Sequence, residues 1–197
     1  MMKKKARSSR STRYIYLVRH GQYEMHGRPH RLGPRLTKKG RLQAERTARR
    51  LARLPIDAIY YSSLRRAAET ARILCKHMPR AKTWKSRALW EGLFTPVPGM
   101  KTTAASMRSA RRHAQTAFRR IFQPARKRDQ RIVVVCHGNI TGYFVSRVLR
   151  APLASWLSVF TQHNCGICTC GVRKKGRFAL FAYNDTSHLP KRLRTLF

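Results

Sequence analysis

The chain has 197 residues, of which 42% are hydrophobic, so it is long enough and apolar enough to form one domain with a sizeable core. This composition excludes an intrinsically disordered protein, and no apolar run is long enough to span a bilayer, so we expect a soluble protein. Lys and Arg number 44 against 7 Asp and Glu, which gives a net charge of +37.

The excess of positive charge predicts a polyanionic partner. The chain has too few acidic residues to neutralise its basic ones, and the resulting self-repulsion opposes a compact isolated fold. A small anionic substrate needs only a local basic pocket, so such a pocket does not account for the whole charge. We expect RNA to be the partner; the alternative is a basic surface that is merely solvated.

The N-terminal segment, Met1 to Arg13, is basic and contains no acidic residue. Its composition fits a mitochondrial presequence or an arm that binds nucleic acid. We expect a mitochondrial protein, with the cytoplasm as the alternative. We divide the chain into this segment (1–13), one domain (14–184) and a basic C-terminal tail (185–197). No repeat or linker divides the domain, and the sequence does not indicate an oligomeric state.

The first half of the domain is predicted to alternate strands and helices. Apolar residues from Tyr14 to Val18 predict a buried strand, and Thr37 is a suitable N-cap for a helix that ends before Pro55. Gly40, in the first turn, is a weak point of that helix, for which close packing is one explanation. We expect a strand over 56–61, a helix from Ser62–Ser63 to about Met78, and a short strand within 84–92 that ends near Leu89. The expected core positions are Ala44, Ala48, Leu51, Ala52, Ala67, Ala71 and Leu74.

The second half predicts a loop, two helices, a central strand and a hairpin. Residues 94–100 contain two prolines and a glycine and predict the loop. Ile132 to Cys136 is a run typical of a central parallel strand, and a helix follows it to about Leu149. Residues 165–172 and 177–183 predict a hairpin around 174–176. Residues 102–122 predict a strongly basic helix with Ala105, Ala114, Ala117, Phe118 and Ile121 facing inward.

The five cysteines do not indicate a secreted disulfide framework, because their number is odd and their spacing irregular. Cys165, Cys168 and Cys170 are spaced like part of a metal site. However, no second ligand cluster accompanies them, and they lie on a predicted strand where small apolar residues are expected. We therefore expect neither a metal nor a cofactor.

Two histidines at strand ends are the main indication of function. His20 follows the first predicted strand and Arg19, and His137 follows the strand of 132–136. Ligands bind at the carboxyl ends of strands in open α/β sheets. A neutral imidazole beside a guanidinium suits attack on a phosphoryl group, because the ring supplies a nucleophile and the cation holds the oxygens.

Five short segments occur in an order shared with a known family. They are Arg19-His20-Gly21, Leu36-Thr37 with Gly40-Arg41 and Gln43-Ala44, Ser62 to Ala71, Glu91-Gly92, and Val135-Cys136-His137-Gly138. From about Tyr14 to Tyr183 the chain resembles the histidine phosphatase superfamily, the phosphoglycerate mutase-like proteins. The resemblance implies a three-layer α/β/α sandwich with a mostly parallel central sheet and an antiparallel edge.

Within that superfamily, Arg19 to Tyr23, Leu89 to Gly92 and Asn164 to Gly166 look most like a mitochondrial group of Ser/Thr protein phosphatases. Gly21 departs from the serine of that group and agrees with most of the superfamily. The chain shows neither the membrane anchor nor the multimerisation segment of that group. We therefore expect that targeting and assembly cannot simply be carried over.

The resemblance implies a role for each residue of a phosphate pocket. His20 attacks phosphorus and becomes phosphohistidine, while Arg19 and Arg66 hold the non-bridging oxygens. Arg66 fits the pattern better than Arg65 because it directly precedes Ala67. Cationic side chains supply the charge stabilisation, so no metal is needed.

The remaining roles belong to Glu91, His137, Gly138 and Asn164. Glu91 is expected to protonate the leaving oxygen and then to deprotonate the attacking water. His137 is expected to be protonated and to add a donor. Gly138 and Asn164 are expected to bind substrate, although for Asn164 the favoured role is to cap a loop. Glu69 is expected to be a charge partner for nearby arginines.

Two functions follow from these residues. One is a phosphohistidine-dependent phosphatase that acts on a phosphoprotein or a small phosphoester; a mutase shares its first step, but the chain shows no extra segments for retaining a bisphosphate. The other is an RNA-bound structural or assembly component of a ribonucleoprotein such as a mitochondrial ribosome, with the pocket retained or vestigial. Basic residues at both termini, around Arg111–Arg112 and over 126–131 favour contact with a phosphate backbone, and no RNA-recognition motif or aromatic stacking platform is visible.

Overall fold

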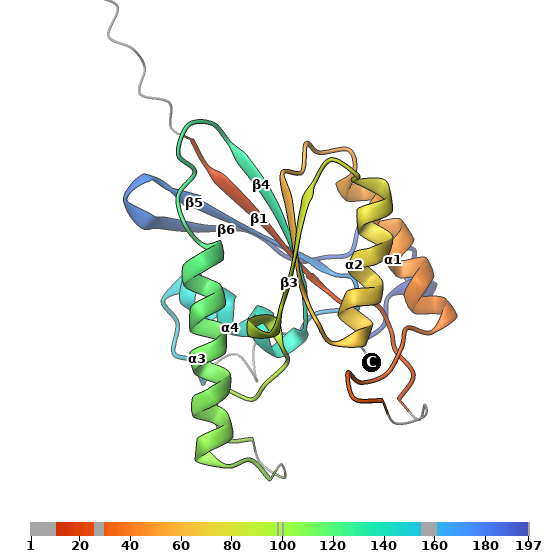
Figure 1. Cartoon of the computed structure of the whole chain (residues 1–197), viewed down its shortest axis with the longest axis vertical. Coiled ribbons are helices and arrows are strands. Elements are labelled where there is room, and N and C mark those ends of the chain that lie inside the picture. Colours follow the sequence, from red (N-terminus) through yellow and green to blue (C-terminus); the bar gives the residue numbers. More distant parts are fainter. Residues whose placement is uncertain (1–10, 26–29, 98, 100, 155–160, 197) are drawn as a thin grey trace, which may run out of the picture.

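A six-stranded mixed sheet lies at the centre of the fold (Figure 1). The computed structural model describes residues 11–25, 30–97, 99, 101–154 and 161–196. The strand order is β3-β2-β4-β1-β5-β6; the first four strands in this order are parallel, and β5 pairs antiparallel with both β1 and β6. The strands are β1 (Arg13–Arg19), β2 (Ala58–Ser62), β3 (Lys82–Ser86), β4 (Gln130–Cys136), β5 (Ile167–Arg173) and β6 (Arg177–Asp185).

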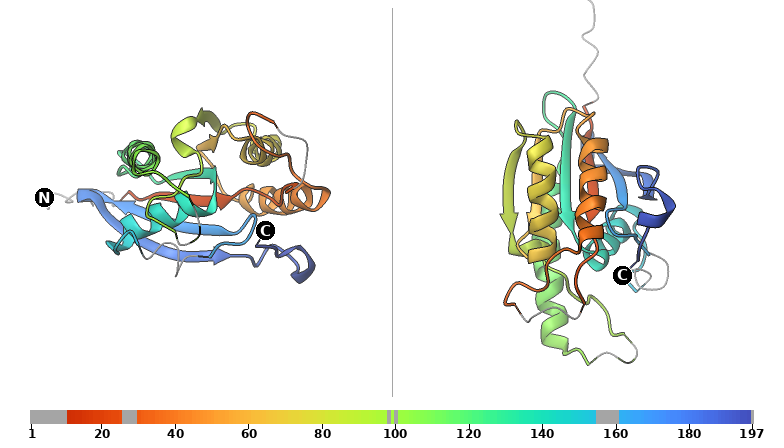
Figure 2. Two further views of the ribbon diagram at one scale, coloured as in Figure 1. Left: turned by 90° about the horizontal axis from the view of Figure 1, so that it is seen from below. Right: turned by 90° about the vertical axis from the view of Figure 1, so that its right-hand side faces the viewer.

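Helices cover both faces of the sheet, which confirms the expected three layers. Alternate side chains of β1 point to opposite faces. Ile15 and Leu17 pack with α3 and α4, whereas Val18 packs with α1 and α2. Figure 2 shows α1 and α2 side by side in front of the sheet. The helices are α1 (Lys38–Leu51), α2 (Arg65–His77), α3 (Ala104–Ile121) and α4 (Gly138–Leu149), with short 3-10 helices at Arg87–Leu89, Lys174–Gly176 and Lys191–Leu193.

Several predicted elements are confirmed and some boundaries are wrong. Thr37 caps α1 by accepting a hydrogen bond from the Gly40 backbone nitrogen at 2.9 Å. The predicted strand ending near Leu89 is instead β3, which ends at Ser86 and is followed by a 3-10 turn. The predicted cap at Ser62–Ser63 is also wrong, because Ser62 ends β2 and α2 begins only at Arg65. The predicted hairpin is confirmed as β5 and β6.

Two alanines expected in the core are exposed. Ala52 follows the last residue of α1 and so lies beyond its buried face. Ala105 lies in the first turn of α3, which extends past the sheet (Figure 1) and leaves that turn exposed. The later positions Ala114, Ala117 and Phe118 are buried as expected.

The C-terminal residues pack against α1. Leu189 is fully buried and Leu193 is 7% exposed, both in the cluster that contains Ala44 and Ala48 of α1. The Gln43 side-chain nitrogen donates to the Leu193 carbonyl at 2.7 Å, which ties this segment to the helix. The N-terminal segment before residue 11 lies outside the described residues. Among the described helices, none is both long enough and apolar enough to cross a membrane.

The first turn of α1 packs against the loop that follows β1 with no room for a side chain. A Cβ at Gly40 would lie 2.0 Å from the Gln22 carbonyl oxygen, and a Cβ at Gly21 would lie 2.5 Å from the Gly40 carbonyl oxygen. The Thr37 backbone nitrogen also donates to that Gln22 carbonyl at 3.0 Å. Because His20 directly precedes this contact, the close packing of two glycines fixes the course of the chain beyond it.

We predict that Gly40→Ala destabilises the protein. The added methyl group displaces residues 21–22, and overpacking of this kind typically lowers the free energy of unfolding by about 1–3 kcal/mol. Lys39→Ala, at the exposed neighbouring position of the same helix, is the control and is expected to change stability by about 0.5 kcal/mol or less. Chemical denaturation measures both, and equal stability of the two variants would show that the contact is not a constraint.

Candidate active site

His20 and His137 emerge side by side because β1 and β4 pair in parallel register. Arg19 and Cys136 are partners at the ends of these strands, so the next residue of each chain reaches the same edge of the sheet. The two rings lie 5.1 Å apart, edge to face, and both histidines are almost completely buried. The juxtaposition expected from the sequence is therefore present.

The hydrogen bonds of His20 identify its tautomer. Its Nδ1 lies 2.8 Å from the Gly21 carbonyl oxygen, which can only accept, so Nδ1 carries the proton. The Arg66 Nε donates to His20 Nε2 at 2.9 Å, so Nε2 presents its lone pair. Burial, followed by the charge of Arg66, lowers the pKa of His20 well below its ordinary value. His20 is therefore neutral, with Nε2 available as a nucleophile.

Two arginines border the lone pair of His20. Arg66 enters from the first turn of α2 and stacks over the Tyr23 ring at 5.1 Å, whereas its neighbour Arg65 points away and pairs with Glu69 at 2.9 Å. That pair confirms the charge partner expected for Glu69. Arg19 donates from Nη1 to the Gln162 carbonyl, and its buried Nε has no hydrogen-bond partner among the described residues.

Glu91 follows the 3-10 helix after β3, and its side chain contacts the N-terminus of α4. Its Oε1 accepts a hydrogen bond from the Asn139 backbone nitrogen at 3.1 Å. Burial raises the pKa of Glu91 to about 7, although Arg66 and Arg19 pull it down. A carboxyl with this pKa can both give and take a proton near neutral pH.

His137 differs from the expectation that it is protonated. Burial, followed by the charges of His20, Arg66 and Arg19, lowers its pKa well below the ordinary value. Its Nε2 lies 2.9 Å from the Ser62 hydroxyl, and its Nδ1 lies 3.9 Å from Glu91 Oε2 without a hydrogen bond. The two guanidiniums make the pocket cationic, so a protonated ring would add to the repulsion, and protonation of His137 in an anionic pocket stays a prediction.

Gly138 and Asn164 occupy different places around the site. Gly138 is the first residue of α4 and lies beside Arg19, since a Cβ there would be 3.7 Å from Arg19 Nε. Asn164 is fully buried; its amide nitrogen donates to the His20 carbonyl at 3.2 Å and its oxygen accepts from Thr195 at 2.9 Å. The structure thus places Asn164 behind the His20 backbone, where it positions that residue.

Sequence reasoning missed three residues that hold the site together. Ser62 bonds to His137, and Thr70 accepts from the Gly21 backbone nitrogen at 3.1 Å while its hydroxyl donates to the Arg66 carbonyl at 2.8 Å. Tyr23 packs against both His20 and Arg66. The signal available for Ser62 was its position at the end of a third parallel strand, next to the strand that carries His137.

The site favours an anion over a metal ion. Among the described residues, the one group of three potential metal ligands is His20, Glu91 and His137, whose ligand atoms lie within 4.8 Å of one another. Arg66 already bonds to the His20 nitrogen, and two guanidiniums would repel a cation here. Cys165, Cys168 and Cys170 are buried in the core with free thiols, Cys165 on the α1 side of the sheet and the other two on the opposite side.

Comparison with known proteins assigns the chain to a family. The sequence model described as the histidine phosphatase superfamily (branch 1) matches residues 15–120 and 81–186, which together span most of the chain. The chain belongs to this superfamily. Among curated relatives, it is 35% identical to "Serine/threonine-protein phosphatase Pgam5, mitochondrial" of Caenorhabditis elegans over 91% of the chain and 34% identical to the Homo sapiens protein of the same description over 92%.

The histidine phosphatase fold is also found in solved structures. The chain is similar to a phosphoglycerate mutase from Plasmodium falciparum, with a TM-score of 0.66 and 30% identity over 92% of this chain and 96% of that one. The Bacillus stearothermophilus protein YhfR matches with a TM-score of 0.72 and 21% identity over 90% of this chain and 100% of that one, which shows a shared fold. The chain spans 65% of the length of the C. elegans and human relatives.

We predict that Ser62→Ala lowers the free energy of unfolding of the histidine phosphatase domain, because it removes a hydrogen bond inside the pocket. The change leaves the fully buried Nε2 of His137 without a partner, which costs about 1–3 kcal/mol. Ser63→Ala is a matched control. The Ser63 hydroxyl accepts a hydrogen bond from the indole nitrogen of the partly exposed Trp90, and water can replace that bond when the hydroxyl is removed. Denaturant unfolding of the two variants measures the difference, and an equal loss in both would contradict the role given to Ser62.

Proposed function

We propose that the chain is a phosphohistidine-dependent phosphatase. The observation that carries this proposal is the neutral His20, whose Nε2 lone pair faces Arg66 and lies in a pocket that also contains Arg19 and a carboxyl with a pKa of about 7. The pocket supplies a nucleophile, a phosphate clamp and a proton donor. We assign the activity to residues 14–184, which the basic segments 1–13 and 185–197 flank.

The first step transfers the phosphoryl group to the enzyme. His20 Nε2 attacks phosphorus, the bond from phosphorus to the leaving oxygen breaks, and Glu91 gives its proton to that oxygen. Arg66 moves its hydrogen bond from His20 Nε2 to a phosphoryl oxygen, and the unpartnered Arg19 Nε offers a second donor.

The second step releases phosphate. Glu91, now ionised, takes a proton from a water molecule that attacks phosphorus, and the bond from phosphorus to His20 Nε2 breaks. The phosphoryl group brings negative charge next to His137, which offsets the cations that lower its pKa. We therefore place protonation of His137 in the phosphate-bound state.

The proposed substrate is a protein phosphorylated on Ser or Thr, and the proposed location is the mitochondrion. The names of the C. elegans and human relatives support both, and favour hydrolysis over mutase transfer. A groove of about 580 Å³ is lined by the Arg65–Glu69 ion pair and by the exposed side chains of Arg72 and Lys85. Its arginine and lysine side chains suit the acidic segments of a phosphoprotein.

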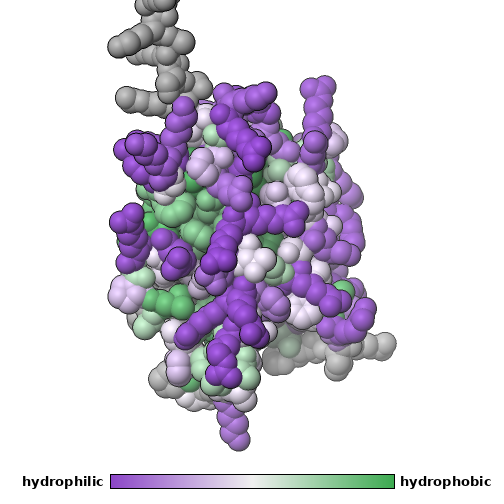
Figure 3. Space-filling view, turned by 60° about the vertical axis from the view of Figure 1, so that its left-hand side comes forward, coloured by the Kyte–Doolittle hydropathy of each residue, from purple (hydrophilic) through white to green (hydrophobic). Residues whose placement is uncertain are grey.

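A second proposal, RNA as a partner, depends on the charge alone. The whole chain has 44 Lys and Arg residues, and in the part that the structure describes, acidic side chains form ion pairs within 4.0 Å with only a small share of the basic ones. Figure 3 shows one face on which hydrophilic side chains surround a smaller hydrophobic patch. The comparisons give no support to an RNA partner, so the unpaired cations are its physical basis.

His20→Ala is expected to abolish hydrolysis of p-nitrophenyl phosphate. Loss of the nucleophile should reduce kcat below about one thousandth of the wild-type value, because the substitution removes the group that accepts the phosphoryl. His113→Ala, at an exposed position on α3, is the control and should retain full activity. Normal turnover by His20→Ala would exclude the proposed mechanism.

Glu91→Gln is expected to slow hydrolysis most for substrates whose leaving group needs a proton. An alkyl phosphate such as phosphoserine has a poor leaving group, so kcat/KM for this substrate should fall by about 100-fold or more. The value of kcat/KM for p-nitrophenyl phosphate, which has a good leaving group, should fall far less. With the alkyl substrate, wild-type kcat/KM should decline as pH rises above about 7, where Glu91 loses its proton. An equal loss of kcat/KM, which reports on the first step alone, for both substrates would contradict the acid role of Glu91.

A further inference from the structure

On the α1 side of the sheet, no α-helix of the described residues covers the β5–β6 hairpin. In Figure 2 (right), α1 and α2 lie in front of the parallel strands, and among the described residues no α-helix lies in front of the β5–β6 hairpin. Because Ile15 and Leu17 face α3 and α4, strand alternation turns Tyr14 and Tyr16 to the opposite side, where Tyr16 packs against the α1–α2 cluster and Tyr14, nearer the hairpin, does not. An uncovered sheet face that carries aromatic side chains is unusual for a layer packed by helices.

Aromatic rings gather on this face from opposite ends of the sequence. The rings of Tyr14 and Phe181 lie 5.8 Å apart, and Phe181 is 49% exposed. A Cβ at Gly171 would lie 2.5 Å from the Phe181 ring, so the ring rests on the Gly171 backbone. The Arg131 guanidinium lies over the Tyr14 ring at 5.2 Å. We call Tyr14, Phe181 and Arg131 the aromatic face.

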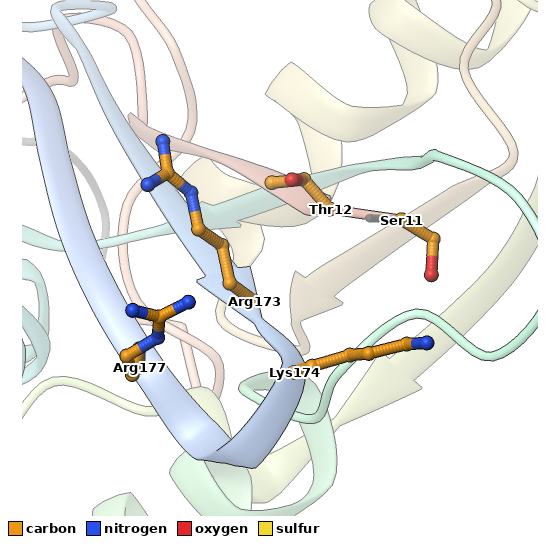
Figure 4. A pocket seen from close by; sticks show the side chains of 5 residues that line it. All are labelled: Ser11, Thr12, Arg173, Lys174 and Arg177. Carbon is orange, nitrogen blue, oxygen red and sulfur yellow. The ribbon is translucent and has the colours of Figure 1, made fainter. Parts of the chain in front are cut away.

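A basic rim borders the aromatic face where β5 turns into β6. Arg173 and Arg177 are direct cross-strand partners, an arrangement of like charges that is unfavourable without an anion. Among the described residues, no carboxylate lies within 4.0 Å of either guanidinium. These arginines, with Ser11, Thr12 and Lys174, line a pocket of about 280 Å³ (Figure 4). Its cations and hydroxyls suit a phosphate group.

We propose that this surface binds single-stranded RNA. Unpaired bases stack on the aromatic face, and the backbone phosphates between them pair with Arg173 and Arg177 at the rim. A duplex would keep its bases away from the rings, and a membrane surface would need apolar side chains that project, whereas Phe181 lies against the sheet. The stacking platform that the sequence did not reveal is thus formed by strands that are distant in the chain.

The RNA surface and the phosphatase pocket are separate. The rim lies at the start of β1 and the pocket lies beyond its end, so the two sites are at opposite ends of one strand. The inference gives a location to the proposed RNA partner and is independent of the phosphatase proposal. Phosphatase activity therefore serves as a test of intact folding for every variant of the RNA surface.

The test is fluorescence anisotropy of a labelled single-stranded RNA with the full chain. Phe181→Ala should weaken binding by about 10-fold, because one base loses its stacking partner. Phe181→Tyr keeps the ring and should bind like the wild type. In Arg173→Ala/Arg177→Ala, the slope of log affinity against log salt should become shallower by about 1.4, corresponding to two phosphate contacts on a single strand. All variants should retain wild-type hydrolysis of p-nitrophenyl phosphate.

Several outcomes would overturn the proposal. Unchanged RNA binding by both Phe181→Ala and the double arginine variant would show that any RNA contact lies elsewhere on the basic surface. Equal affinity for a duplex of the same sequence would show that the rings contribute nothing. Tight binding to phosphatidylserine vesicles together with weak binding to RNA would identify an anionic membrane as the partner. A shallower salt slope caused equally by Arg108→Ala/Arg112→Ala on α3 would show that the rim has no special role.

Discussion

The pairing of β1 with β4 is the constraint on which the rest of the molecule depends. Seven consecutive residue pairs fix the register of these parallel strands, and the side chains of Val133, Val134 and Val135 are completely buried between the two helical layers. A shift of one residue would turn each strand's core side chains to the wrong face. The same register delivers His20 and His137 to one edge as neighbours, so core packing and the geometry of the site are set by a single contact.

The site gathers positive charge in a buried place, and its protonation states follow from that fact. Burial and the nearby guanidiniums lower the pKa of both histidines, while at Glu91 burial outweighs the guanidiniums and raises the pKa to about 7. The positive charge of the two guanidiniums is balanced when an anion binds in the pocket. A phosphoryl group supplies this negative charge next to His20, the residue that attacks it. Because only an anionic ligand is attracted to the buried guanidiniums, the pocket is selective for phosphate over neutral ligands.

Local patterns made much of the fold predictable, while contacts between distant segments did not. The β-branched run of β4 and the Thr37 cap depend on neighbouring residues and were correctly read. Ser62 was misread as a cap because its real partner, His137, lies far along the chain. The exposure of Ala105 follows from the length of α3 relative to the sheet, which periodicity does not encode. The aromatic face likewise exists only once β1 and β6 are placed in one sheet.

The central claim is that His20 carries the phosphoryl group on Nε2, since Nδ1 is committed to the Gly21 carbonyl. Rapid quench of the enzyme with a phosphorylated substrate, followed by 31P NMR of the denatured phosphoenzyme, tests this most directly. We predict a phosphohistidine resonance with the Nε2 linkage, absent from His20→Ala. A linkage through Nδ1, a phosphoryl group on another residue, or the same resonance in His20→Ala would contradict the account.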